Sequence, residues 1–208
     1  MKKVAVLLDL GHLMYQLYKP LGKRNATADE IAEFANKCAL IDEEIFRIYC
    51  YHCEPFDGTE LHPLTRVPIH FKSSGTYKHM SSLLNDLSIK KGIAYRAGEL
   101  QFNGWLIKKL AAREIAKTRR PLIAGDFEPD LKQKRVDMKI GLDVAWLSSK
   151  SIVDRILLVT ADSDFVPAMK FARREGVQVV LIKLNHSLKR DLMVHADEVR
   201  EIVYPPAP

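Results

Sequence analysis

The sequence predicts an α/β protein in which helices cover both faces of a central, mostly parallel sheet. Three short apolar runs rich in branched residues, 4–8, 156–159 and 177–182, have the composition of strands that are buried on both sides. Segments with the helical spacing of apolar residues separate these runs, and such alternation is typical of a parallel sheet. The length of 208 residues suits a single domain over 1–208, with a tail from Pro205 onward.

The first half of the chain supplies its elements in the order this fold requires. A strand over 3–8 ends at Asp9, and Thr27 with Glu30 forms a capping box that begins a later helix. The apolar stripe of that later helix is expected to reach Ile41. The other elements expected here are a helix over 12–18, an alternating strand over 44–53, a long irregular loop over 54–74 and a helix over 77–91.

The second half continues the alternation. A strand over 93–102, with a break expected at Gly98, precedes an amphipathic helix over 105–115. The segment 117–134 has few apolar residues, two prolines and dense positive charge, and is therefore expected to be an exposed loop. The remaining elements expected are a helix over 136–147, a strand over 156–159, a helix over 165–175, a strand over 177–182, a short helix over 188–194 and a strand over 198–204.

Composition and charge narrow the class of protein. The formal net charge is +6 and the sequence pI about 9.2, which permits a polyanionic partner. The first apolar run is too short for a signal peptide, and Asp9 interrupts it. No segment approaches the length of a membrane span, so we expect a cytoplasmic protein without a membrane partner.

The three cysteines predict neither disulfides nor zinc. Cys38, Cys50 and Cys53 are odd in number in a chain without an export signal. The spacing of Cys50 and Cys53 invites comparison with zinc ligands. On a strand, however, the two side chains point to opposite faces, and no second pair of Cys or His lies at ligand spacing. Buried thiols are expected.

Acidic residues follow two of the predicted buried strands. Asp9 ends the first strand, and Asp162 and Asp164 follow the strand over 156–159, just before a helix begins. Ligands of open parallel sheets bind at this carboxyl edge. If the two strands are neighbours, Asp9 and Asp162 emerge side by side, and their mutual repulsion calls for a cation.

The helix over 136–147 adds two further carboxylates. Val136, Ile140, Asp143 and Leu147 share one stripe, so Asp143 takes a place where the pattern expects an apolar residue. Asp137 lies in the first turn, where the helix dipole also favours an acid. Hard oxygen ligands without His or Cys favour Mg²⁺ or Mn²⁺, ions that activate water and bind phosphate oxygens.

The order of these motifs resembles the NYN domain, a LabA-like branch of the PIN-like nuclease superfamily. The matching features are Asp9 at the first strand end, the run 134–137 with Asp143 six residues on, and the motif 160–165. The resemblance implies a compact α/β/α sandwich and a Mg²⁺-dependent ribonuclease site. By motif position it implies that the metal-binding and catalytic acids are Asp9, Asp137, Asp162 and Asp164, with Asp143 in support.

Three other residues belong to the same motifs. The family usually has asparagine three residues after the first aspartate, whereas this chain has His12, which can hydrogen-bond the neighbouring acid or a phosphate. Thr160 stands where the family often has serine, and Ser163 lies inside the third motif. We treat these three as supporting residues.

Basic residues flank the acidic motifs and favour RNA, single-stranded or structured, as the partner. A positive rim around an acidic, metal-loaded pocket allows a nucleic-acid backbone to approach. The candidates for RNA binding are Lys78, Arg119, Arg120, Lys132, Lys134 and Arg135. A homodimer is an open alternative to a monomer, because a second subunit lengthens an RNA groove.

Two classes of function remain in competition. The leading one is a metal-dependent endoribonuclease that hydrolyses phosphodiester bonds. The other is a catalytically silent or weak RNA-binding regulatory module of the same fold. A haloacid-dehalogenase-like phosphatase is set aside, because its chemistry requires an acid where this chain has Gly11. Dinucleotide binding is disfavoured, since no glycine-rich turn follows the first strand.

Overall fold

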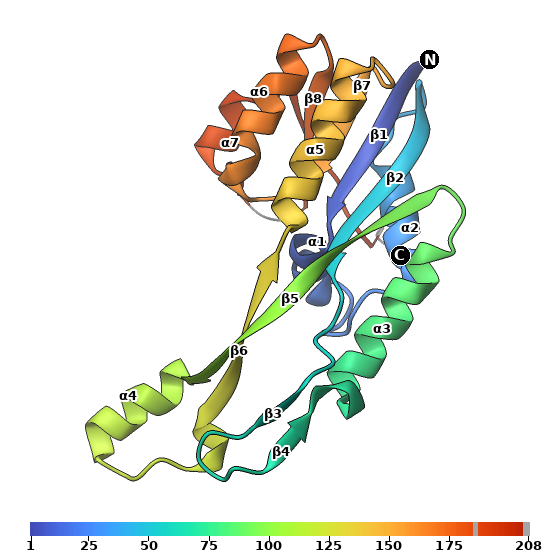
Figure 1. The fold of residues 1–208 in the computed structure, drawn as a ribbon. Helices are drawn as coiled ribbons and strands as arrows, with labels where there is room; N and C mark the ends of the chain where they lie inside the picture. Colours follow the sequence, from blue (N-terminus) through green and yellow to red (C-terminus); the bar gives the residue numbers. More distant parts are fainter. Residues whose placement is uncertain (185–186, 206–208) are drawn as a thin grey trace. The chain divides into compact units, whose positions relative to one another are not determined.

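The computed structural model describes residues 1–184 and 187–205, which form two compact units (Figure 1). The first unit comprises residues 1–52, 83–98 and 135 onward. The second comprises residues 53–82 and 99–134. A single domain over 1–208 stays a prediction, and the expected tail falls, apart from Pro205, outside the described residues.

Within the described residues, seven strands form one sheet in the order β6-β5-β2-β1-β7-β8-β9. β1 pairs in parallel with both β2 and β7, and β8 pairs in parallel with both β7 and β9. β6 pairs antiparallel with the part of β5 that begins at Glu99. This arrangement confirms the predicted mostly parallel α/β sheet. The strands are β1 (Lys2–Asp9), β2 (Glu43–Cys53), β5 (Ile93–Ile107), β6 (Phe127–Lys134), β7 (Arg155–Val159), β8 (Gln178–Lys183) and β9 (Glu198–Glu201).

From the central strand β1 the chain first adds β2 on one side. It later adds β7 on the opposite side of β1, and β8 follows next to β7. Right-handed crossovers in opposite directions place their helices on opposite faces of the sheet. Accordingly, α5 and α6 lie side by side on one face and α2 on the other (Figure 1). Because both faces are covered, Val4–Leu8 and Ile156–Val159 are almost completely buried. The point where the chain changes direction lies between β1 and β7.

The helices of the first unit follow the predicted apolar spacing. The capping box of Thr27 and Glu30 is present, with both of its hydrogen bonds. The predicted stripe ends earlier than expected, because α2 stops at Lys37 and Ile41 is fully exposed. The helices are α1 (Leu10–Tyr18), α2 (Ala28–Lys37), α5 (Val136–Ser149), α6 (Val166–Arg174) and α7 (Arg190–Val194), with α3 (Gly75–Ser88) shared between the units.

The structure corrects four predictions for residues 54–134. The segment 54–74 is not an irregular loop throughout, because β3 (Thr59–Leu61) and β4 (Pro68–His70) pair as a hairpin. The segment 117–134 contains strand β6 and the short helix η2 (Ala124–Asp126). Residues 105–107 extend β5, so α4 (Lys109–Thr118) begins later than the expected helix. The expected break at Gly98 is absent, and β5 is irregular between Phe102 and Trp105 instead.

An aromatic cluster forms the interior of the second unit. The rings of Phe56 and Phe102 stack with centroids 5.7 Å apart, and Phe71 packs edge-on against Phe56. The indole nitrogen of Trp105 donates a hydrogen bond to the carbonyl of Leu61, 3.0 Å away. All four rings are half-buried, so this cluster packs its aromatic faces together without being fully enclosed.

The cysteine side chains have the buried environment that the sequence predicts. Cys38, Cys50 and Cys53 are buried thiols. Burial raises the pKa of the Cys38 and Cys50 thiols to about 12, so both are protonated and inert at neutral pH. Among the helices of the described residues, none has both the length and the apolar character needed to cross a bilayer.

Candidate active site

The carboxyl ends of β1 and β7 bring two of the predicted acids to one edge of the sheet. Leu8 pairs with Val159 in the parallel register, so the next residues, Asp9 and Thr160, leave the two strands at the same level. Asp162 follows two residues later and caps the short helix η3 (Ser163–Phe165). This edge lies at the point where the strand order reverses, which is the ligand-binding place of open α/β sheets.

A series of hydrogen bonds links these residues. The Asp9 carboxylate caps α1, with Oδ1 accepting from the backbone N–H of His12 at 3.1 Å. The Thr160 hydroxyl lies 3.5 Å from Asp9 Oδ2 and accepts the backbone N–H of Asp162 at 3.1 Å. Asp162 Oδ1 accepts the backbone N–H of Asp164 at 3.0 Å. Thr160 and the backbone of His12 therefore hold the Asp9 carboxylate in place, and the supporting roles of Thr160 and of the His12 side chain stay predictions.

The electrostatics of this edge are unfavourable for its carboxylates. Burial raises the pKa of Asp9, and the negative charges of Asp137 and Asp162 raise it further, against the hydrogen bonds from His12 and Gly11. Burial also raises the pKa of Asp137, and the charges of Asp162 and Asp164 add to that rise. Asp9 and Asp137 thus both lie within range of neighbouring negative charges.

Positive side chains do not neutralise these acids. Among the described residues, no lysine or arginine forms an ion pair with Asp9, Asp137, Asp162 or Asp164. The nearest cation that the hydrogen bonds place here is Lys189, whose Nζ donates to the Ser163 hydroxyl at 3.4 Å. No sequence pattern indicated Lys189, because it precedes a short helix that follows a different strand.

The acids of this edge could bind a hard cation directly through only one or two carboxylates. In the part of the chain that the structure describes, no three His, Cys, Asp or Glu side chains lie close enough together to enclose a metal ion. Mg²⁺, however, usually takes one or two carboxylates and keeps several water molecules. Oxygen donors with raised pKa values and no competing lysine or arginine are chemically suited to that mode.

Asp143 is held by other partners than these four acids. Its carboxylate accepts two hydrogen bonds from Arg96, at 3.0 and 3.2 Å, and one from the Tyr51 hydroxyl at 2.8 Å. The buried stripe of α5 runs through Val144, and Asp143 lies beside it. The acid that interrupts the apolar pattern is therefore explained by an ion pair between α5 and β5, and its supporting role at the site stays a prediction.

The predicted RNA-binding residues have different surroundings. Lys78, Arg119, Lys132 and Lys134 are exposed members of the second unit, and Arg135 begins α5 in the first unit with a left-handed φ of 71°. Arg120 is engaged internally: its guanidinium binds both oxygens of the buried Asp126, at 2.7 and 2.8 Å, and Glu114 at 3.1 Å. Arg120 therefore joins the end of α4 to η2.

A doubly wound α/β/α sandwich with acids at the ends of its two central strands defines a protein of the nuclease-like PIN type. The chain belongs to the NYN domain family, because the family model described as "NYN domain" matches residues 3–202, almost the whole sequence. The predicted family resemblance is confirmed.

Two individual proteins are similar to this chain. An uncharacterized protein of Methanocaldococcus jannaschii is 33% identical over 76 residues, which make up 36% of this chain and 32% of that protein. The chain thus matches about a third of the length of this curated relative. A crystal structure of a protein of unknown function from Vibrio parahaemolyticus covers 97% of this chain and 93% of its own, with a TM-score of 0.52 and 16% identity. That likeness supports the fold alone.

Proposed function

We propose that the protein is a ribonuclease that depends on Mg²⁺ or Mn²⁺ and hydrolyses RNA phosphodiester bonds with the acids of the β1 and β7 ends. One observation carries the proposal. Asp9, Asp137, Asp162 and Asp164 repel one another across three elements, and no lysine or arginine of the described residues pairs with them. Such an arrangement is costly for folding unless a ligand uses it.

The residues have distinct tasks in this proposal. Asp9 and Asp162 would hold the cation, because the hydrogen bonds from the His12 N–H and the Asp164 N–H fix the orientation of their carboxylates. A bound Mg²⁺ or Mn²⁺ would supply Lewis-acid activation of water and of a phosphate oxygen. Thr160, with its hydroxyl between Asp9 and the Asp162 backbone, keeps the two strand ends in register.

Asp137 is suited to accept a proton. Its carboxylate is exposed at the first turn of α5, and neighbouring charges raise its pKa. A carboxylate whose pKa lies closer to neutrality is a better general base than an ordinary one. Asp164 would assist through its charge, since it contributes to the raised pKa of Asp137.

Exposed lysines would bring the RNA to the acids. Lys132 and Lys134 project from β6, and Lys78 lies in the first turns of α3. Contacts of this kind to phosphates supply affinity without sequence preference and make binding depend on salt.

The proposal is tested with labelled single-stranded RNA and purified protein. Cleavage is expected with Mg²⁺ or Mn²⁺ and is expected to stop with EDTA. The Asp9→Asn and Asp162→Asn variants should remain folded by circular dichroism and lose activity. The matched control is Asp154→Asn, an exposed aspartate that precedes β7 at its amino end and binds the Lys3 N–H. Intact RNA under every metal would remove the hydrolase.

The second candidate is a catalytically silent RNA-binding module. The observation in its favour is that no three candidate ligand side chains among the described residues gather closely enough to enclose an ion. This candidate predicts RNA binding that is equal in EDTA and in Mg²⁺, and no cleavage under either condition.

A further inference from the structure

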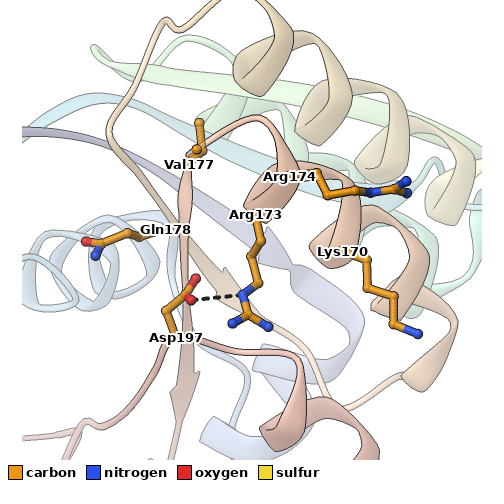
Figure 2. A pocket seen from close by; sticks show the side chains of 7 residues that line it. Lys170, Arg173, Arg174, Val177, Gln178 and Asp197 are labelled. Atoms are coloured by element: carbon orange, nitrogen blue, oxygen red, sulfur yellow. Dashed lines mark hydrogen bonds and ion pairs between the residues drawn. The ribbon is translucent and has the colours of Figure 1, made fainter.

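A pocket of about 600 Å³ lies where α6 ends and β8 begins. It is lined by Lys170, Arg173 and Arg174 of α6, by the turn at Gly176 and Val177, and by Gln178 and Asp197 (Figure 2). None of the acids of the candidate active site lines this pocket. The whole pocket belongs to the first unit.

The side chains of this pocket carry an excess of positive charge. The one acid in its lining is Asp197, and both of its oxygens are already bound. Oδ1 accepts from Arg173 Nε at 2.8 Å, and Oδ2 accepts from the backbone N–H of Val179 at 2.8 Å. The charge of Asp197 therefore balances that of Arg173, and the charges of Lys170 and Arg174 remain uncompensated.

Asp197 also fixes the direction of the Arg173 guanidinium. The ion pair uses Nε and leaves both terminal nitrogens of the fork without a hydrogen-bond partner among the described residues (Figure 2). A guanidinium held in this way presents two parallel N–H groups, the geometry that binds two oxygens of a phosphate.

Lys170 and Arg174 stand one helical turn apart on the same face of α6, and their side chains extend on the side away from Asp197 (Figure 2). Like charges at this spacing destabilise a helix. The helix dipole favours cations in the last turn and so explains Arg173 and Arg174. It does not explain Lys170, which lies in the middle of the nine-residue helix.

We propose that this pocket is a phosphate-binding site in which Lys170, Arg173 and Arg174 hold an RNA backbone phosphate away from the acids. Helix α6 connects the two places: it begins two residues after Asp164 and ends at the pocket. Nine residues span about 14 Å, which is about four nucleotides at the stacked rise of about 3.4 Å. RNA as the source of the phosphate rests on the proposed function, whereas the phosphate site itself does not.

The test compares two double variants in EDTA, so that RNA stays intact. Lys170→Gln/Arg174→Gln removes the two uncompensated charges, and Lys91→Gln/Lys150→Gln removes two exposed charges elsewhere in the first unit. Binding of a labelled oligouridylate of about twelve nucleotides is measured by anisotropy over a series of salt concentrations. A second arm measures binding of inorganic pyrophosphate by calorimetry.

The pocket variant is expected to lower the slope of log affinity against log salt by about 0.7, the value for one phosphate of a single strand that no longer meets a cation. If the pocket variant loses pyrophosphate binding but keeps the salt slope of RNA binding, the pocket binds phosphate and the proposal that RNA occupies it is refuted. If the pocket variant equals the control variant in both arms, the phosphate site is overturned. A lowered salt slope in the pocket variant, together with no RNA cleavage by the wild type in Mg²⁺ or Mn²⁺, would count against the ribonuclease alone.

Discussion

The hydroxyl of Thr160 lies between two acids of different strand ends, 3.5 Å from the Asp9 carboxylate and 3.1 Å from the backbone nitrogen of Asp162. One side chain thus couples the end of β1 to the residue that follows β7. The parallel register already brings Leu8 level with Val159. The hydrogen bonds of Thr160 therefore fix the positions of Asp9 and Asp162 relative to each other. The acids are therefore positioned by the most deeply buried part of the fold.

The first prediction concerns Asp9 and pH. Burial and the neighbouring carboxylates raise the pKa of Asp9, so the folded state binds this proton more tightly than the unfolded state. Stability from this group is then highest at acidic pH and falls as pH rises through its folded pKa. Asp9→Asn should raise the melting temperature in EDTA at pH 7, since Asn also caps a helix well. Calorimetry at pH 7 and at pH 4 checks this. An equal change at both pH values would contradict it.

The second prediction concerns a buried ion cluster at the start of β2. The Glu43 side chain is fully buried and accepts hydrogen bonds from Arg155 at 2.6 Å and from Arg200 at 2.9 and 3.2 Å. Removing its charge leaves Glu198, 3.0 Å from Arg200 and 3.9 Å from Arg155, to balance two guanidinium groups, so Glu43→Gln should lower the free energy of unfolding by about 3 kcal/mol. Urea unfolding measures the change. The adjacent exposed Glu44→Gln should change it by less than about 0.5 kcal/mol.

The same cluster predicts acid sensitivity. Burial raises the pKa of Glu43, but the hydrogen bonds from Arg200, the Leu40 N–H and Arg155 outweigh it and lower the pKa to about 2. A carboxylate whose pKa is lowered on folding stabilises the folded state at pH values above its unfolded pKa. For Glu43 this stability is lost as pH falls from about 4.5 toward about 2. Unfolding experiments on wild type and Glu43→Gln should therefore converge at low pH. A difference that stays constant over this range would show that the charge of Glu43 is not responsible.

The third prediction separates Asp143 from the catalytic acids. Asp143→Asn weakens the pairing with Arg96 and the hydrogen bond from Tyr51, which should cost about 1 kcal/mol of unfolding free energy. Metal affinity and RNA cleavage should stay close to those of wild type once the protein is folded. A large loss of metal affinity in this variant would instead show that Asp143 contributes to the metal site.

The fourth prediction divides the basic residues of the second unit. Arg120 is held by Asp126 and Glu114, whereas Lys132 and Lys134 are exposed on β6. Lys132→Gln/Lys134→Gln should weaken RNA binding and reduce its salt slope by about 1.4 without altering thermal stability. Arg120→Gln should lower thermal stability and leave the salt slope unchanged. Anisotropy and melting curves on both variants distinguish the two roles, and a reversed pattern would refute the assignment.

The sequence predicts the first unit well because its strands are buried on both faces, and such strands are continuous apolar runs. β6 shows why the second unit is harder to predict. Only Phe127, Pro129 and Leu131 alternate on its apolar side, and the proline and the lysines at its end are typical of loops. Its pairing with a distant stretch of β5 supplies what local composition does not.

The site shows the same division. Acids at strand ends are visible in the sequence because the end of an apolar run fixes where they emerge. The partner of Asp143 is not visible, since Arg96 lies 47 residues away on another element. The basic pocket on α6 cannot be predicted from the sequence either, because it depends on the ion pair by which the distant Asp197 orients Arg173. Residues positioned by backbone register can be predicted, and residues positioned by distant side chains cannot.

The central claim is that carboxylates from the ends of β1 and β7 hold one hard cation together. Calorimetric titration of the metal-free protein with Mn²⁺ tests it most directly, in wild type, Asp9→Asn, Asp162→Asn and Asp143→Asn. We predict a saturable site in wild type, retained in Asp143→Asn and weakened at least about tenfold in each of the other two variants. Equal Mn²⁺ binding in all four proteins, or none in wild type, would contradict the claim.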